Sequence, residues 1–146
     1  MGKKREVYYR FKKFGTLSFT SITKVNDFIN HLEGGKVMGT RCKDCGLVFF
    51  PPRADCYQCL SNTMDWFEVS GEGKLVTFSR LEYGPAGFEA DLPYCIALVD
   101  YGNFKVFGRM APDIPENEIK SGMAVTTVVH TLPNGQLTYF FQKALG

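Results

Sequence analysis

The 146-residue sequence is poor in the residues and motifs that many catalytic sites require. It holds only two histidines, and neither His31 nor His130 lies in a recognisable catalytic motif. The sequence lacks a Ser-His-Asp order, an H-E-x-x-H pair, a P-loop and a G-x-G-x-x-G followed by a helix. Gly71-Glu72-Gly73 precedes an expected strand, so we interpret it as a turn. No catalytic residue is identified.

Long apolar runs are missing as well. Lys3, Lys4 and Arg5 are followed by no apolar stretch of the kind that a secretory signal needs. No other segment approaches the length of a membrane-spanning helix. We therefore expect a cytoplasmic protein without a membrane partner, in a compartment where thiols stay reduced.

Cysteine is scarce, but four of the five cysteines form two C-x-x-C pairs separated by ten residues. Cys42, Cys45, Cys56 and Cys59 have the spacing of a tetrahedral four-thiolate metal site. Two disulfides or four unrelated buried cysteines are the alternatives, and a reducing compartment disfavours the first. Zinc and iron both suit such a site. Because four protein ligands leave no open position, we expect one structural metal ion, with zinc preferred.

The two short loops that carry these cysteines, the knuckles, differ in one position. Gly46 follows the second cysteine of the first knuckle and supplies the freedom for a tight turn. Leu60 holds the matching place after Cys59, so we expect the second knuckle to be less regular. Three nearby cations can offset the negative charge of four thiolates. These cations are Arg41, Lys43 and Arg53.

The formal charge of +2 hides an asymmetry along the chain. Residues 1–60 hold eleven Lys and Arg against five Asp and Glu, a net +6, whereas residues 61–146 hold six against ten, a net −4. Most of the basic excess lies in the first thirteen residues. Such a tail is either solvated and loosely ordered or an arm that docks on a surface. Its interleaved aromatic residues, among them Phe11 and Phe14, favour docking.

Periodicity predicts one amphipathic helix over residues 21–33, capped by Thr20 or Ser21 and ended by Gly34-Gly35. The metal segment follows, and its Val48–Phe50 stretch is interpreted as a strand stopped by two prolines. Alternation and turn residues predict further strands at 66–69, 74–83, 94–99, 105–110, 125–130 and 137–141, with a helical turn at 116–120.

Short strands of this number and spacing favour a small Greek-key barrel, with the OB-fold preferred and an SH3-like barrel as the alternative. The predicted fold is therefore mainly β with an N-terminal helix, a rubredoxin-like four-cysteine zinc ribbon and an OB-fold barrel. The predicted divisions are an arm and helix at 1–35, the ribbon at 36–62 and the barrel at 63–146.

This sequence resembles the zinc-ribbon/OB-fold acyl-CoA-associated family, long labelled a domain of unknown function. The resemblance covers essentially the whole chain after about residue 20. It is carried by Cys42-x-x-Cys45-Gly46, Phe50-Pro51-Pro52-Arg53, Cys56-x-x-Cys59, Trp66, Val69-Ser70-Gly71-x-Gly73, Pro93-Tyr94 and Gly122-Met123-x-Val125. The sequence departs from the family pattern at Leu60, where glycine is usual, and in its basic aromatic N-terminus.

The resemblance implies a non-catalytic accessory subunit of an acyl-CoA-processing complex, most often with a thiolase-superfamily large subunit. The helix and the ribbon would hold that subunit, and the barrel would help to shape the acyl-CoA site. On this interpretation Arg41, Lys43 and Arg53 could approach the phosphates of coenzyme A rather than only balance the metal cluster. A hetero-oligomer is expected.

Two rival functions stay open at this point. An OB-fold with a zinc ribbon could bind single-stranded nucleic acid, but the acidic second half of the chain lacks the positive charge that such binding needs, so none is expected. A rubredoxin-like iron site could transfer electrons. The fifth cysteine, Cys95, lies in an apolar stretch that favours core packing over catalysis.

Overall fold

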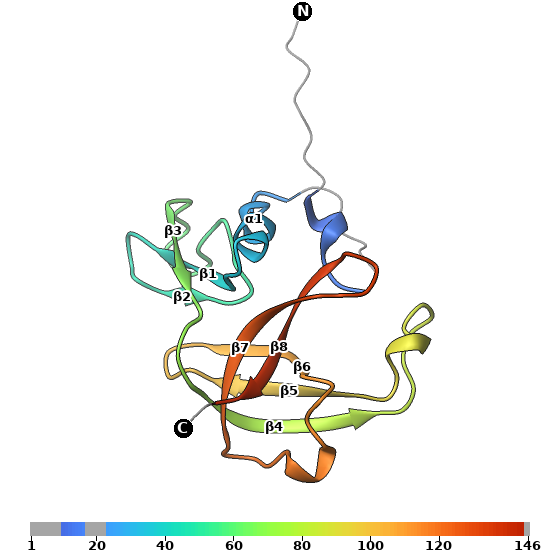
Figure 1. Ribbon diagram of the computed structural model, residues 1–146. Helices are drawn as coiled ribbons and strands as arrows, with labels where there is room; N and C mark the ends of the chain where they lie inside the picture. The colour runs from blue at the N-terminus through green and yellow to red at the C-terminus, as the bar shows by residue number, and fades with distance from the viewer. Residues whose placement is uncertain (1–9, 17–22, 145–146) are drawn as a thin grey trace, which may run out of the picture.

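The structure is a computed structural model, and it describes residues 10–16 and 23–144. Figure 1 shows a small sheet beside a larger barrel, with the α-helix of the described residues next to the sheet. The small sheet has the order β2-β1-β3, from β1 (Met38–Cys42), β2 (Val48–Phe49) and β3 (Met64–Glu68). The fold class predicted from the sequence is confirmed.

The barrel contains five strands: β4 (Gly73–Leu81), β5 (Tyr94–Asp100), β6 (Lys105–Met110), β7 (Ala124–Thr131) and β8 (Leu137–Lys143). They close in the order β4-β5-β6-β8-β7, with β4 also paired to β7. Only β6 and β8 pair in parallel among these neighbours, as Arg109 lies opposite Phe140. This closed Greek-key arrangement is the expected OB-fold rather than an SH3-like barrel.

Two features of the small sheet differ from the sequence interpretation. The strand β1 was not predicted, because Met38-Gly39-Thr40-Arg41 shows no clear apolar alternation. The strand around Trp66 was counted with the barrel, yet β3 pairs with β1 along its whole length, with Trp66 opposite Thr40. The small sheet therefore extends to Glu68.

One apolar core joins the helix to the barrel. Inward-facing barrel residues such as Leu75, Val99 and Phe141 are almost fully buried. The helix contributes Phe28, Ile29 and Leu32 to the same cluster, and the segments on either side of the small sheet contribute Val37 and Val69. Each such side chain stabilises the fold by about 1.5–3 kcal/mol through burial. The helix and the barrel are thus held by shared packing.

The helix α1 (Asp27–Glu33) is shorter than predicted. The predicted caps Thr20 and Ser21 lie outside the described residues. In the described part the helix begins after Asn26, because Thr23 accepts a hydrogen bond from the Val25 amide (3.3 Å) and so holds a turn there. The predicted end is correct: Gly34 donates to the carbonyl of Asn30 at 3.2 Å, and Gly35 has a φ of +83°.

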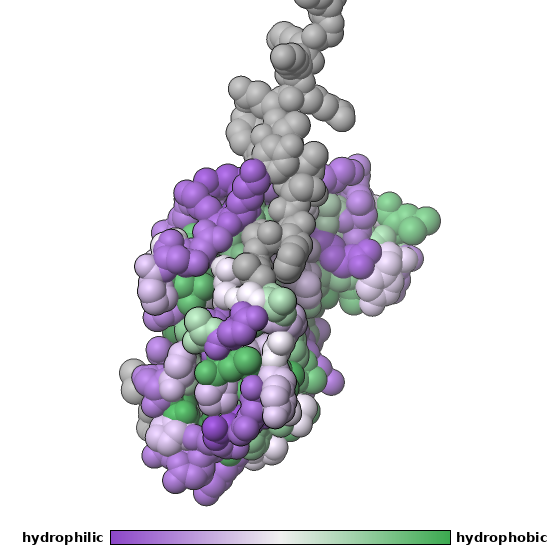
Figure 2. All heavy atoms as spheres, turned by 90° about the vertical axis from the view of Figure 1, so that its right-hand side faces the viewer, coloured by the Kyte–Doolittle hydropathy of each residue, from purple (hydrophilic) through white to green (hydrophobic). Residues whose placement is uncertain are grey.

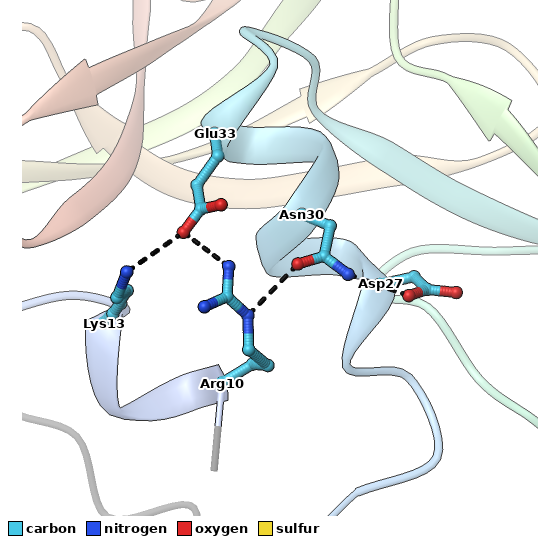
Figure 3. Close-up of polar contacts among 5 residues, drawn as sticks. All are labelled: Arg10, Lys13, Asp27, Asn30 and Glu33. Carbon is cyan, nitrogen blue, oxygen red and sulfur yellow. Dashed lines mark hydrogen bonds and ion pairs between the residues drawn. The ribbon is translucent and has the colours of Figure 1, made fainter. Parts of the chain in front are cut away.

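Residues 10–16, which we call the strap, pack on the rest of the chain. The strap starts with the 3₁₀ turn η1 (Arg10–Lys13). The guanidinium of Arg10 pairs with Glu33 (2.5 Å) and donates to Asn30 (3.1 Å), and the ammonium of Lys13 reaches the same Glu33 oxygen at 3.3 Å (Figure 3). Arg10 and Lys13 are therefore ion-paired rather than simply solvated.

The aromatic residues of the strap dock on this chain itself. Phe11 stacks on Phe28 with 5.7 Å between ring centroids, and Phe14 meets the same ring edge-on. Phe14 also forms a β-bridge with Leu137, and Gly15 donates to the Leu137 carbonyl at 2.7 Å. The strap thus links α1 to the β7–β8 hairpin.

Two more 3₁₀ turns, η2 (Glu89–Asp91) and η3 (Glu116–Glu118), lie in the connections before β5 and before β7. The second confirms the helical turn predicted at 116–120. Among the described residues no helix has the length and apolar character needed to cross a membrane.

Candidate metal centre

The structure brings the four predicted cysteine ligands together. Their sulfur atoms all lie within 4.8 Å of one another. The Cys42 and Cys59 sulfurs are 3.4 Å apart, and those of Cys45 and Cys56 are 3.6 Å apart. A tetrahedral zinc with Zn–S bonds of about 2.3 Å separates its sulfur ligands by about 3.8 Å. The sulfur cluster therefore has the dimensions of a four-thiolate zinc site.

The two knuckles have the same backbone hydrogen bonds. In the first, Cys42 donates to the Leu47 carbonyl (2.9 Å) and Gly46 donates back to the Cys42 carbonyl (2.9 Å). In the second, Cys56 donates to Ser61 (2.8 Å) and Leu60 donates to Cys56 (3.0 Å). Gly46 and Leu60 both have positive φ, +78° and +63°. The expectation of a less regular second knuckle is therefore wrong in its hydrogen bonding.

Backbone amides and neighbouring sulfurs shift the pKa values of the four thiols in different directions. The amides of Cys45 and Asp44 lower the pKa of Cys42 to about 7, against the effect of burial. In the same way the Cys59 and Gln58 amides lower the pKa of Cys56.

The other two thiols ionise with more difficulty. The Ser61 amide lowers the pKa of Cys59, but the Cys42 sulfur and burial outweigh it and raise that pKa to about 12. The pKa of Cys45 is also raised, because burial and the Cys56 sulfur outweigh the amide of Leu47. Repulsion among several thiolates in one place has this effect, and a bound divalent cation relieves it.

A buried threonine connects the small sheet to the segment before the second knuckle. The Thr40 side chain, only 1% exposed, accepts from the Arg53 amide and donates to the Arg53 carbonyl, both at 2.9 Å. Next to it, Gly39 leaves room for neighbours, since a Cβ there would lie 2.5 Å from the Phe49 carbonyl and 2.7 Å from the Phe67 ring. These contacts join β1, which ends at Cys42, to the segment that leads into Cys56.

The three predicted cations lie close to the knuckle cysteines in the chain and have different local partners. Lys43 pairs with Asp65 at 3.3 Å. The Arg53 guanidinium lies over the Phe49 and Tyr57 rings, 5.6 and 5.5 Å from their centroids. Arg41 is exposed on β1 and makes no ion pair within the described ranges. Their proximity to the knuckles is clear, and their role toward coenzyme A stays a prediction.

A second candidate site, which sequence reasoning missed, is a cavity of about 460 Å³ at one end of the barrel. It lies beside the β4–β5 connection. Figure 2 shows the side of the molecule on which Figure 1 draws that connection, and apolar residues there lie among polar ones. The Arg109 guanidinium lies 3.9 Å from the Tyr94 ring centroid and donates to Asp91 at 2.9 Å. Another arginine, Arg80, pairs with Glu116 across the cavity lining. The strand register, together with the connections that contain η2 and η3, places these residues together, so the sequence carried no signal for them.

Two residues singled out from the sequence also line this cavity. Cys95 lies opposite Arg80 in the β4–β5 pair, and burial, aided by Glu116, raises the pKa of its thiol. The ring of His130 lies 4.9 Å from that of Phe140. A thiol that is harder to ionise is a poor nucleophile, which agrees with the packing role predicted for Cys95. The other histidine, His31, packs against Trp66.

Family models assign both parts of the chain. The ChsH2 rubredoxin-like zinc ribbon domain matches residues 31–65, and the ChsH2 C-terminal OB-fold domain matches residues 66–130. The chain belongs to the ChsH2 (DUF35) family. The four-cysteine cluster described above is therefore the zinc ribbon of a ChsH2 protein, and its geometry fits the metal that the family description implies.

Several relatives of this ChsH2-family chain have names that state a role. A DUF35 domain-containing scaffold protein of Methanocaldococcus jannaschii is 32% identical over 73% of this chain and 79% of its own length. The benzoylsuccinyl-CoA thiolase subunit BbsA of Geobacter metallireducens is 28% identical over 72% of this chain and 73% of its own length. BbsA of Thauera aromatica is 33% identical over 49% of each chain.

Solved structures of the ChsH2 family share the fold. The chain named Ltp2-ChsH2(DUF35) aldolase has a TM-score of 0.71 at 23% identity, over 86% of this chain and 99% of that one. A DUF35-family protein of unknown function from Sulfolobus solfataricus has a TM-score of 0.54 at 21% identity, over 80% and 83%. At these identities the likeness supports the fold alone.

Proposed function

We propose that this protein is a non-catalytic accessory subunit of an acyl-CoA-processing complex, and that its partner is the large subunit of a thiolase. The observation that carries the proposal is the likeness to BbsA of Geobacter metallireducens, named a thiolase subunit, over 72% of this chain. The complex would be a cytoplasmic hetero-oligomer that makes or cleaves carbon–carbon bonds in acyl-CoA thioesters. Relatives named scaffold proteins support a role in assembly.

The chemistry of the described residues agrees with a subunit that supports catalysis without contributing catalytic residues. The thiol of Cys95 has a raised pKa, and its pocket neighbour Arg80 is already paired with Glu116. His130 lies against an aromatic ring, and the four remaining cysteines form the ribbon cluster. A thiolase needs an activated cysteine with a base beside it. We therefore assign the bond-making residues to the partner.

Each part of the molecule has a proposed task in this complex. One structural zinc, held by the four cysteines, would keep the ribbon rigid enough to dock, because metal binding contributes folding free energy. Arg41 and Lys43 would contact the phosphates of coenzyme A, and Arg53 would face the large subunit. The barrel would help to shape the entrance for the acyl chain, and its cavity of about 460 Å³ offers apolar lining for that purpose.

Reconstitution tests the proposal directly. The metal-loaded protein is co-expressed with each thiolase-superfamily large chain of its source organism, and complexes are isolated by gel filtration. We expect one large chain to co-elute and to cleave acyl-CoA with free coenzyme A faster in the complex than alone. The Cys42→Ser chain is the control and should not co-elute. If no thiolase chain binds the intact protein, the proposal is wrong.

A further inference from the structure

The second knuckle carries a strained residue whose side chain packs on almost nothing. Leu60 is the one residue other than glycine with positive φ among residues 10–16 and 23–144. A side chain with a Cβ is unfavourable in this left-handed region. Leu60 is nevertheless 84% exposed, so burial within this chain does not offset the strain.

The first knuckle shows that the fold does not require an apolar residue here. Both knuckles have the same hydrogen bonds, and Gly46 occupies the position of Leu60 with almost the same φ. After its first cysteine the first knuckle has Lys43, where the second has Tyr57. Tyr57 is 64% exposed. The ribbon therefore presents one polar knuckle and one apolar knuckle on equivalent backbones.

The apolar knuckle also has an unpaired cation beside it. Arg53 lies over the Tyr57 ring, and its Nε donates to the backbone carbonyl of Asp55 at 3.3 Å. Within the described part of the chain, no carboxylate pairs with Arg53. Residues held on a rigid loop lose little conformational freedom on binding. Tyrosine and arginine are also enriched among the residues that dominate interface energies.

We propose that the second knuckle is the anchor of this protein on its large subunit, with Leu60 and Tyr57 filling an apolar pocket and Arg53 facing a carboxylate on the pocket rim. This inference rests on the proposed function and names the contact that the complex requires. The unpaired Arg53 argues for an acidic rim, and the exposed apolar pair argues for the pocket. On this proposal the strained backbone of Leu60 is retained because its side chain binds the large subunit rather than this chain.

The anchor predicts that one substitution changes stability and binding in opposite directions. Leu60→Gly removes the strain, so the metal-loaded free chain should unfold at an equal or higher denaturant concentration. The same change removes the anchor, so affinity for the large subunit should fall at least tenfold. Both quantities are measured on the full chain, by denaturant unfolding and by titration calorimetry with the purified large subunit.

Matched variants separate the anchor from a general effect of apolar surface. Tyr83, 90% exposed in the β4–η2 connection, provides the control, and Tyr83→Ala should leave the affinity unchanged. Replacing both Tyr57→Lys and Leu60→Gly copies the first knuckle and should weaken binding more than either change alone. Arg53→Gln should reduce both the affinity and its dependence on salt.

The possible results distinguish this inference from the proposed function. If the wild-type chain binds a thiolase subunit and Leu60→Gly binds equally well, the anchor is wrong and the accessory role stands. If the wild-type chain binds no thiolase subunit, both are wrong. If Leu60→Gly instead abolishes self-association of this chain in sedimentation experiments while thiolase binding is unchanged, the knuckle joins two copies and the proposed occupant is wrong.

Discussion

At the residue scale, Thr40 shows how a small polar side chain fixes the position of a distant loop. Its hydroxyl satisfies both backbone groups of Arg53 inside the protein, thirteen residues away. Without it, the Arg53 amide and carbonyl lose a partly buried partner, which costs more than the hydrogen bonds contribute in net terms. A residue that appeared unremarkable in the sequence therefore supports the metal ligands.

Thr40→Val should lower the free energy of unfolding of the zinc-loaded protein by about 2 kcal/mol, because it keeps the shape and removes both hydrogen bonds. Denaturant titration measures the change. Thr77→Val, on an exposed position of β4, is the matched control and should change stability little. Equal stabilities for the wild-type and Thr40→Val proteins would contradict the importance of this hydrogen-bond pair.

Asp91 is the second residue for which the structure gives a measurable consequence. Burial raises the pKa of Asp91, but hydrogen bonds from Thr16 and Arg109 outweigh it, and the pKa is lowered overall. A carboxyl group with a lowered folded-state pKa stabilises the protein above its unfolded pKa of about 3.9 and loses that effect as pH falls through the folded value. The Asp91–Arg109 pair is therefore a neutral-pH stabiliser.

Asp91→Asn should be less stable than the wild-type protein at pH 7, and the difference should shrink as pH falls below about 4. Urea unfolding at a series of pH values measures it. A stability difference that is constant from pH 7 to pH 3 would show that the charge of Asp91 is not responsible.

At the element scale, the strap changes the meaning of the basic N-terminal sequence. Charge and aromatic residues suggested a surface that docks on something, and the part from Arg10 to Thr16 docks on α1 and the β7–β8 hairpin. The Glu33 carboxylate accepts hydrogen bonds from both Arg10 and Lys13, and these hydrogen bonds lower the pKa of Glu33. The pairing is therefore present at neutral pH and is lost as acid protonates Glu33.

Glu33→Gln should loosen the strap at pH 7 without unfolding the barrel, because it removes the partner of two cations. Hydrogen exchange of the Gly15 amide, which donates to Leu137 at 2.7 Å, is the readout and should become faster. The control is Glu118→Gln, which breaks a comparable exposed pair with Lys143 (2.6 Å) far from the strap. If Gly15 exchanges at the same rate in both variants, aromatic packing alone holds the strap.

The local sequence pattern predicted most strands of the barrel. It failed for elements whose formation depends on pairing with distant strands. The strands from β4 to β8 are short segments rich in apolar and β-branched residues and bounded by turns such as the one at Gly135, so the sequence located them closely. The strand β1 lacks such alternation and exists because β2 and β3 bind to both of its edges. The start of α1 was misplaced because a Thr23 turn competes with the helix.

At the scale of the whole molecule, the metal cluster has a small core of its own, while β3 of the same sheet also packs on the main core through Trp66 and Phe67. The small core next to the cluster contains Cys42, Cys56 and Phe49, whereas the main core joins α1 to the barrel. A unit with so small a core depends on its metal for stability. Trp66, the sole tryptophan, lies on β3 of the metal-dependent sheet and reports on it.

Removal of zinc by a strong chelator should shift the fluorescence of Trp66 to longer wavelength, because β3 loses its packing beside His31. The far-ultraviolet circular dichroism of the whole protein should change less, because the barrel strands stay folded. Restoring zinc should reverse the shift, and Cys95→Ser should behave like the wild type because Cys95 lies in the barrel. Fluorescence that is unchanged after complete zinc removal would show that the ribbon is stable without metal.

The sequence by itself determined which four cysteines cluster, the order of ribbon and barrel, and most barrel strands. These depend on local spacing: two C-x-x-C pairs place thiolates on two turns, and alternation places side chains on two faces of a strand. Only the tertiary structure decided which strands share a sheet, where the strap lies and which residues line the barrel cavity. It also showed that Leu60 adopts the conformation of Gly46. Each of these depends on contacts between residues far apart in the chain, and no local pattern records such contacts.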